Sequence, residues 1–351
     1  MIYFNNDYSE GCHGAVLQKL TETNMAQTPG YGMDDYCKDA ADKIRILCKN
    51  DDLAVHFLVG GTQTNLTVIS AALRPHQGVI GANTAHVQVH ETGAIEATGH
   101  KVLSIPSDDG KIDAAQIDDA VSAHFRDEAA EHMVQPKMVY ISNPTELGTI
   151  YTLQELEAIS KTCKEHGLYL FLDGARLGYG LTAKGNDVAM ADLARLCDVF
   201  YIGGTKVGAL FGEAVVISNP AIADDFRYLI KQHGGMLAKG RLLGIQFCAL
   251  LEDDLYYKIA GRANSLADQL RDTLERLGYP LFVPGVTNQV FTVLPDALLE
   301  KLKESFCFSE QQRIDKNHRA VRFCTSWATT QENMDALCCA IEELSIKTLG
   351  S

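Results

Sequence analysis

The chain reads Phe171-Leu172-Asp173-Gly174-Ala175-Arg176 at the end of one apolar run and Tyr201-Ile202-Gly203-Gly204-Thr205-Lys206-Val207-Gly208 at the end of another. Each short apolar run predicts a buried strand, and each is followed at once by glycines and a charged side chain. The residues between them leave room for one helix and one strand. Because ligands collect at the carboxyl ends of strands in an open parallel sheet, Asp173 and Lys206 are the first candidates for a binding site.

Helices and strands alternate on both sides of these two segments. Short apolar strands that alternate with helices predict a largely parallel sheet covered on both faces, which is an α/β fold. Asp113 and Thr152 are predicted helix N-caps, and Glu155 completes a capping box with Thr152. The predicted strands cover about 56–59, 79–81, 101–105, 138–142, 169–172, 199–202 and 214–217, and the predicted helices cover about 33–48, 64–72, 94–97, 114–125, 152–166 and 192–197.

The character of the sequence changes after about residue 250. A long helix is predicted at 254–277, followed by strands at 288–294 and 320–324 and a last helix at 330–349. This block predicts a smaller α+β domain. We therefore expect two domains: an N-terminal segment with a large domain over 1–250, and a small C-terminal domain over 251–351.

Composition excludes several classes of protein. The net charge of −14 over 351 residues argues against binding to nucleic acid or to anionic membranes. The ten cysteines are scattered without a C-x-x-C pair, so reduced core thiols are expected and no metal site is predicted. The chain begins without a basic, apolar leader and holds no apolar stretch long enough to span a membrane. We expect a cytoplasmic protein.

The segment Gly60-Gly61-Thr62-Gln63-Thr64-Asn65 lies between a predicted strand and a predicted helix. Glycines allow a ligand to approach the backbone, and a helix N-terminus offers free N–H groups and a positive dipole end to an anion. The segment therefore suits a phosphate, although a simple turn is the alternative. It matches neither the nucleotide P-loop nor the G-x-G-x-x-G pattern of dinucleotide-binding proteins.

Three charged side chains at the strand ends suit a planar cofactor. A buried carboxylate such as Asp173 needs a partner, and a pyridinium nitrogen would provide one; a helix N-cap is the alternative. The fork of Arg176 suits an oxyanion, with a surface or interdomain salt bridge as the alternative. Lys206 among glycines at a strand end differs from a solvated surface lysine, since desolvation makes such an amine nucleophilic.

His86 follows the predicted strand at 79–81, with His90 and Glu91 close behind. An imidazole at this place suits stacking on a cofactor ring and acid–base chemistry. A structural histidine is the alternative.

Several segments agree with one family when they are taken together and in order. They are Tyr31-Gly32-Met33-Asp34, Gly61-Thr62-Gln63-Thr64-Asn65-Leu66, Ala85-His86, Ser142-Asn143-Pro144-Thr145, Asp173-Gly174-Ala175-Arg176 and Val321-Arg322-Phe323. This set closely resembles the threonine aldolases, which are pyridoxal-phosphate enzymes often grouped as β-eliminating lyases. The resemblance spans most of the chain, and motifs in their expected context carry more weight than any one of them alone.

The resemblance implies a fold and a set of roles. The fold is that of the pyridoxal-phosphate-dependent transferases (fold type I, the aspartate-aminotransferase fold), with a mostly parallel seven-stranded sheet. Lys206 would form the Schiff base with pyridoxal 5′-phosphate, and the resemblance implies a homodimer or homotetramer. The remaining roles are the phosphate for Gly61, Thr62 and Gln63, the ring nitrogen for Asp173, ring stacking for His86, cofactor contact for Asn143 and Arg176, and the substrate carboxylate for Arg176 and Arg322, with Asn6 or Asp7 nearby.

The sequence departs from the family in three places. The lysine motif reads Thr205-Lys206-Val207 instead of S-K-G, and the N-terminal S-D-T-x-T becomes Asn6-Asp7-Tyr8-Ser9. An arginine that follows Gly-Gly-Met in the family is Leu237 here, so Lys239 or Arg241 is expected to supply its positive charge. These changes concern the substrate more than the cofactor.

The expected reaction is cleavage of a β-hydroxy-α-amino acid, such as threonine or allo-threonine, to glycine and an aldehyde. The breaking bond delivers its electrons to the pyridinium ring, and His86, or less favourably Glu91, takes the β-hydroxyl proton. The alternatives are a β-eliminating lyase, an aminotransferase, and a catalytically silent pyridoxal-phosphate protein. A nucleotide-dependent Rossmann enzyme is disfavoured because G-x-G-x-x-G is missing.

Overall fold

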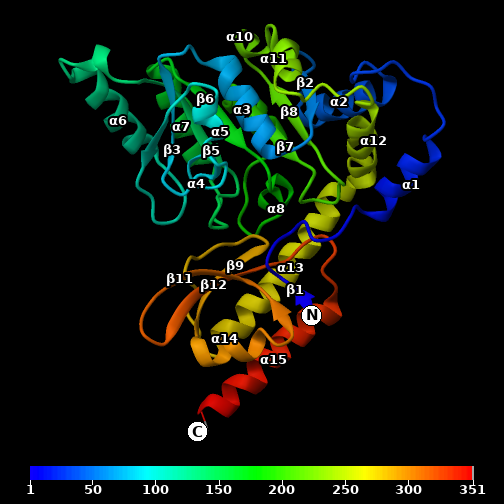
Figure 1. Cartoon of the computed structure of the whole chain (residues 1–351), viewed down its shortest axis with the longest axis vertical. Helices are drawn as coiled ribbons and strands as arrows, with labels where there is room; N and C mark the ends of the chain where they lie inside the picture. Colours follow the sequence, from blue (N-terminus) through cyan, green and yellow to red (C-terminus); the bar gives the residue numbers. More distant parts are fainter. Residues whose placement is uncertain (350–351) are drawn as a thin grey trace.

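The computed structural model describes residues 1–349, with side chains described through residue 346. Figure 1 shows a large unit built around a central sheet, a smaller unit below it, and one long helix that runs through both. The sheet order is β2-β8-β7-β6-β5-β3-β4. Its strands are β2 (Ala54–Leu58), β3 (Gln77–Ala82), β4 (Val102–Ile105), β5 (Gln135–Ser142), β6 (Tyr169–Asp173), β7 (Val199–Gly203) and β8 (Glu213–Ile217).

The seven-stranded, mostly parallel sheet is confirmed. Only β8 runs against its neighbours, pairing antiparallel with both β2 and β7, whereas β3, β4, β5, β6 and β7 pair in parallel. Strands β3, β7 and β8 are buried along their whole length, which is why they read as continuous apolar runs.

Helices cover both faces of the sheet (Figure 1). The capping boxes at Asp113 and Thr152 are confirmed. Helix α3 begins at Gly61, three residues before the predicted start, so the glycine pair forms its N-terminus. The helices of the large unit are α1 (Gly14–Glu22), α2 (Asp35–Cys48), α3 (Gly61–Ala72), α4 (His86–Val89), α5 (Ala94–Ala97), α6 (Ala114–Arg126), α7 (Leu153–Glu165), α8 (Leu177–Leu181), α9 (Met190–Leu196), α10 (Pro220–Ala223), α11 (Phe226–Gln232) and α12 (Arg241–Leu250), with short 3-10 turns at Ala130–His132 and Glu252–Asp254.

Helix α12 was not predicted from the sequence. It is buried continuously from Leu243 to Leu250, so it lacks the polar face that makes a helix recognisable by its periodicity. Helix α1 was missed as well.

The small unit is α+β, as expected. Its sheet has the order β11-β12-β9, and a separate parallel pair joins β1 to β10. Its elements are β1 (Ile2–Tyr3), β9 (Gln289–Pro295), β10 (Phe306–Cys307), β11 (Ser309–Arg313), β12 (His318–Cys324), α14 (Asp296–Leu302), α15 (Gln331–Leu349) and the long helix α13 (Leu255–Arg276).

Helix α13 belongs to two hydrophobic cores. Its first half, from Tyr256 to Ala263, packs in the core of the large unit. Its second half, from Leu266 to Leu274, packs in the small core. Phe4 also lies in the small core, so the chain begins in one unit, builds the other and returns. The division at residue 250 stays a prediction, and α13 gives the two units a rigid link.

Candidate active site

A cavity of about 830 Å³ opens at the carboxyl ends of β6 and β7. Its wall also includes the loop after β2, helix α4 and residues of the small unit. Of the side chains singled out in the sequence, the cavity brings together Gly61, Thr62, His86, Asp173, Arg176, Lys206 and Arg322. Residues that lie far apart in the chain therefore converge on one space at the edge of the sheet where ligands are expected.

The loops that carry Asp173 and Lys206 are held against each other by glycines. The amide of Gly203 donates to the carbonyl of Gly174 at 2.9 Å. A Cβ at Gly174 would stand 1.9 Å from the Tyr201 carbonyl oxygen, which no side chain tolerates. The glycines are thus required for close packing, and this packing fixes the lysine loop beside the aspartate.

Asp173 is buried and fully engaged. The hydroxyl of Tyr140 and the amide group of Asn65 both donate to Oδ2, and the backbone amide of Ala175 donates to Oδ1 at 2.9 Å. Each oxygen of the carboxyl group therefore accepts at least one hydrogen bond. A buried anion held in this way suits a cationic ring nitrogen.

His86, which is half-buried, forms a pair with the buried Glu91. Nδ1 of His86 lies 2.7 Å from Oε1 of Glu91, whose side chain has no exposed surface. Asn65 donates to the same glutamate oxygen at 2.6 Å and to Asp173 at 3.3 Å. Burial lowers the pKa of His86, but the hydrogen bond to Glu91 and the charges of Glu146 and Asp173 raise it more, so its net pKa lies above the ordinary value.

The N-terminus of α3 provides space for an anion. Within residues 1–349, no side-chain hydrogen bond caps this helix, so its first amides are free. A Cβ built at Gly60 would meet no atom within 4 Å, which leaves open space against the backbone. This end of the cavity therefore fits a phosphate group.

Arg176 is already paired inside the cavity wall. Its Nε donates to Oδ2 of Asp7 at 2.8 Å and its second terminal nitrogen to Oδ1 at 3.1 Å, and Asn288 donates to the same carboxylate at 2.9 Å. Burial raises the pKa of Asp7, but the charges of Arg176 and Lys206 lower it more, so its net pKa is below the ordinary value. Asp7 thus orients Arg176 and leaves for a ligand only the Nη1 side, which lies 3.7 Å from Oε2 of Glu146.

Arg322 has a free donor. Its terminal nitrogens bond the Asn5 carbonyl at 2.9 Å and the Gln289 side chain at 3.1 Å. Its Nε is buried and has no hydrogen-bond partner among the residues that the structure describes. Arg322 lines the cavity, and a buried donor without a partner is a place for a ligand oxygen.

Two of the remaining predicted residues support the cavity from outside. Gln63 accepts from the Val59 amide at 3.3 Å and donates to the His233 carbonyl at 3.1 Å. Asn143 is fully buried, and its Oδ1 accepts from the Tyr151 amide at 3.1 Å. Neither lines the cavity, so their predicted cofactor contacts stay predictions.

Asn6, Lys239 and Arg241 also lie outside the cavity. Oδ1 of Asn6 accepts from its own turn, at Tyr8 and Ser9. Lys239 is exposed, and Arg241 donates to carbonyls of residues 23 and 26. None of the three reaches the phosphate end within one chain.

Two acids of the cavity wall were not predicted from the sequence. Glu146 lies 3.7 Å from Arg176, and Glu213 is buried beside Lys206 and Thr205. Glu146 directly follows the segment Ser142–Thr145 at the end of strand β5. Its place just after a strand end could have identified it as a candidate site residue. Glu213 opens a strand, and no local pattern marks it.

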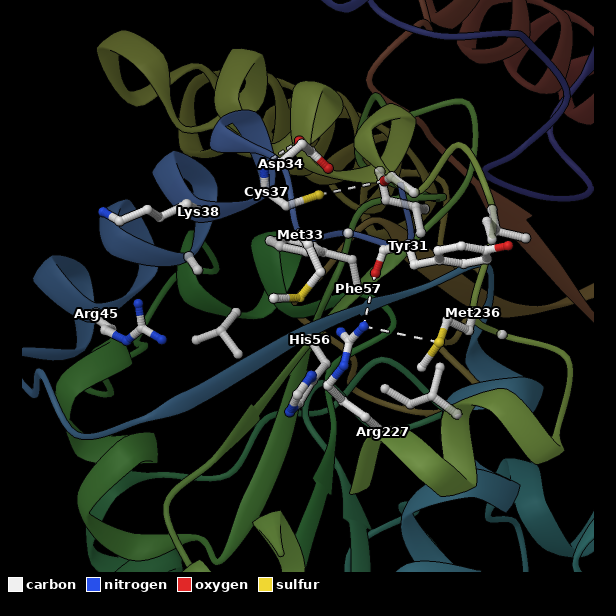
Figure 2. Close-up of a pocket in the computed structure, with 18 residues that line it drawn as sticks. Tyr31, Met33, Asp34, Cys37, Lys38, Arg45, His56, Phe57, Arg227 and Met236 are labelled. Atoms are coloured by element: carbon white, nitrogen blue, oxygen red, sulfur yellow. Dashed lines mark hydrogen bonds between the residues drawn. The ribbon is translucent and has the colours of Figure 1, made fainter. Parts of the chain in front are cut away.

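Figure 2 shows a second cavity, of about 360 Å³, between α2, β2 and α11. Tyr31, Met33 and Asp34 line it, but Asp34 acts as the N-cap of α2, accepting from the Cys37 amide at 2.9 Å. Arg227 donates to the Tyr31 carbonyl at 3.1 Å. Burial and the charges of Arg227 and Arg45 lower the pKa of His56 to about 4. The two cavities have separate linings, so this one is distinct from the space around Lys206.

The fold and the main cavity together define a class. A lysine and a buried aspartate in one cavity, with open space at a helix N-terminus, fit pyridoxal phosphate in an enzyme of the aspartate-aminotransferase fold. The solved structure of aspartate aminotransferase from Thermus thermophilus agrees in fold, with a TM-score of 0.70 at 15% identity over 98% of this chain and 91% of that chain.

Closer comparisons give the family. The family model described as beta-eliminating lyase matches residues 8–297. A low specificity L-threonine aldolase of Pseudomonas aeruginosa is 34% identical over 86% of both chains. The threonine aldolase structure from Leishmania major is 47% identical, has a TM-score of 0.96, and is matched over 98% of this chain and 100% of that one. The chain belongs to the beta-eliminating lyase family and is a pyridoxal-phosphate-dependent lyase.

Two features are absent from the described residues. Over residues 1–349, no helix is long and apolar enough to cross a bilayer. The same residues hold no cluster of three or more His, Cys, Asp or Glu side chains arranged for a metal ion.

Proposed function

We propose that this protein cleaves a β-hydroxy-α-amino acid of the threonine type to glycine and an aldehyde. The reactions named for its relatives from Pseudomonas aeruginosa and Leishmania major support this proposal. The observation that carries it is the single cavity in which Lys206 meets both a carboxylate anchor, Arg322, and a paired imidazole, His86. Aldol cleavage needs a site for each of these groups.

The cavity residues would hold the cofactor at three points. Lys206 would attach it covalently, Asp173 would pair with its ring nitrogen, and Gly61 and Thr62 would bind its phosphate, with His86 over the ring. Pyridoxal phosphate, when bound, supplies the electron sink that accepts the electrons of the breaking bond at the substrate Cα. Supporting cofactor roles for Gln63, Asn143 and Lys239 stay proposals.

Two arginines would orient the substrate. Arg322 offers its unpaired Nε to the substrate carboxylate. Arg176, fixed by Asp7, offers the guanidinium edge that Asp7 leaves free. Asn6 is proposed to act next to them, as part of the segment that carries Asp7. A carboxylate held by two fixed arginines limits rotation about the substrate Cα, which selects the bond that breaks.

His86 is the proposed base. If Nδ1–H donates to Glu91, the lone pair of Nε2 is left to take the β-hydroxyl proton of the substrate. The carboxylate also stabilises the imidazolium that results. Because Asn65 ties Glu91 to Asp173, the base and the predicted ring partner share one rigid support.

The test is product analysis on protein with its cofactor fully bound. Threonine, allo-threonine and phenylserine are offered in turn, and aldehyde and glycine are measured. Aldehyde in equal amount to glycine is the expected result. Release of ammonia and a keto acid, or turnover only with an added keto acid, would instead indicate elimination or transamination and overturn the proposal.

We also infer a cytoplasmic homodimer or homotetramer. Apolar side chains that are largely exposed support an interface: Tyr31 is 48% exposed, Met33 66% and Tyr228 75%. Arg227 of α11 binds the Tyr31 carbonyl, which brings these residues onto neighbouring segments. Exposed apolar groups that cluster in this way mark association surfaces. Light scattering on the purified protein gives the number of subunits.

A further inference from the structure

Glu213 is a buried acid with one unused oxygen. Its residue is only 3% exposed, yet it lines the cavity that holds Lys206. Oε1 accepts from the Thr205 hydroxyl at 3.0 Å. Oε2 has no hydrogen-bond partner anywhere in the part of the chain that the structure describes, Lys206 included. Buried polar atoms are nearly always paired, so an unpaired one on a residue that lines a cavity calls for a ligand.

The sheet places this acid next to the phosphate-binding loop. Because β8 is antiparallel to both neighbours, its first residue, Glu213, pairs with Leu58 at the end of β2 and with Gly203 at the end of β7. Leu58 is followed by Val59 and then by the glycines that open α3, and Gly203 leads into the lysine loop. Glu213 therefore stands between the free helix amides and Lys206.

Its surroundings disfavour a negative charge. Burial and the charge of Asp173 raise the pKa of Glu213 more than the charge of Lys206 and the hydrogen bonds from Thr205 and the Gly204 amide lower it, so its net pKa is about 8. The other titratable neighbours are the buried phenols of Tyr201 on β7 and Tyr256 on α13. A phosphate brought to the same end of the cavity would repel a carboxylate further.

We propose that Glu213 acts as a neutral carboxylic acid whose Oε2 proton is donated to the cofactor phosphate. This inference rests on the cofactor site proposed above. Oε1 already accepts from Thr205, so the acid proton belongs on Oε2. The Thr205 hydroxyl, which also accepts from the Gly212 amide at 2.9 Å, is committed to Glu213 and cannot donate to the phosphate. The acid thus replaces that hydroxyl as the donor.

The test compares cofactor affinity in wild type, Glu213→Gln and Glu213→Ala between pH 7 and pH 9, by equilibrium dialysis read from cofactor absorbance. The Glu213→Gln variant keeps a neutral donor that cannot ionise. It should bind like wild type at pH 7, whereas at pH 9 wild type should bind about tenfold more weakly because its free acid has ionised. Glu213→Ala should bind more weakly than Glu213→Gln at both pH values. Parallel pH dependence in wild type and Glu213→Gln would overturn the proposal.

A Lys206→Ala background separates the phosphate from the lysine. There the cofactor binds without a covalent bond. The pH-dependent difference between Lys206→Ala alone and Lys206→Ala combined with Glu213→Gln should persist but move to higher pH, because the charge of Lys206 lowers the pKa of Glu213, so this pair is compared over a wider alkaline range. Its disappearance would assign Glu213 to the lysine amine and overturn the proposal. Dialysis measures cofactor binding only. A protein that binds the cofactor but releases no aldehyde would therefore contradict the proposed aldol cleavage without affecting the conclusion on Glu213.

Discussion

Asp173 and Glu213 are two buried acids in the same sheet, and the groups that donate hydrogen bonds to them are different. Asp173 closes the parallel strand β6 and receives donors on both oxygens. Glu213 opens the reversed strand β8, accepts from the Thr205 hydroxyl on Oε1 with the Gly204 amide close by, and leaves Oε2 without a partner among the described residues. Asp173 thus has three donors around its carboxyl group, whereas burial outweighs the donors at Glu213, raises its pKa to about 8 and favours the neutral acid.

The comparison between Asp173 and Glu213 shows that two carboxyl groups at the same edge of one sheet can have different electrostatic surroundings. Strands that run in parallel bring backbone and side-chain donors to their carboxyl ends, and Asp173 uses them. The reversed strand β8 brings Glu213 to the same edge, where its donors are the Thr205 hydroxyl and the Gly204 amide. The cavity thus presents an anion at one place and a neutral acid at the other, which suits a ligand with a cationic nitrogen and an anionic phosphate.

The largest effect should follow from removing the charge at Asp173. In Asp173→Asn we expect kcat for amino acid cleavage to fall on the order of 10³-fold, because the buried charge is lost while the shape is kept. Steady-state kinetics on cofactor-saturated protein measures the fall. Asp198→Asn is the matched control: Asp198 accepts from the Leu170 amide and from Asn219 at the opposite edge of the sheet and should keep activity. A near-normal kcat in Asp173→Asn would contradict the claim that Asp173, unlike Glu213, acts through its negative charge.

The sequence predicted Asp173 and Lys206 because their signals are local. Each follows an apolar strand directly and sits among glycines, so a short window contains both the strand end and the turn. No short stretch of sequence around Glu213 marks it in this way. Its place in the cavity depends on the pairing of β8 with β7 and with β2, and β2 is distant in sequence. The Asp7–Arg176 pair was hidden for the same reason: it joins the start of the chain to the end of β6.

The same limit applies to the fold. The alternation of strands and helices predicted the sheet, because burial on both faces gives apolar runs. It did not predict the reversal of β8, because an antiparallel strand buried on both faces reads like a parallel one. Helix α12 was missed through burial on all sides. Pairing direction and complete burial are tertiary properties that local periodicity does not contain.

The next largest effect is on the free energy of unfolding, and it arises from Glu213 and not from Asp173. Its pKa of about 8 in the folded protein lies above the ordinary 4.5, so the native state holds a proton that the unfolded chain loses. Native stability therefore falls as the pH rises from about 4.5 to about 8. Glu213→Gln removes this loss, and at pH 7 the cofactor-free variant should be more stable than wild type by about 3 kcal/mol. Urea unfolding at pH 5, pH 7 and pH 8 measures the difference.

The exposed Glu128→Gln is the control for that comparison, since Glu128 lies at the surface. It should unfold like wild type at each pH. If wild type and Glu213→Gln lose stability in parallel between pH 5 and pH 8, Glu213 is ionised in the folded protein, and the contrast with Asp173 disappears.

The smallest effect concerns the pKa of His86, which a chain of hydrogen bonds joins to Asp173. Asn65 joins Asp173 to Glu91, and Glu91 holds His86. Burial lowers the His86 pKa, and the hydrogen bond to Glu91 is the largest influence that raises it. In Glu91→Gln the His86 pKa should drop, so the acidic limb of the kcat/KM profile should move to lower pH by about one unit.

Because the amide of Glu91→Gln cannot stabilise an imidazolium as the carboxylate does, kcat should fall together with that shift. The two readouts therefore report on the same hydrogen bond, one in the free enzyme and one during turnover. A profile that does not move would show that His86 is not the group that must lose its proton. The base would then be sought at Glu146, the other acid in this part of the cavity wall.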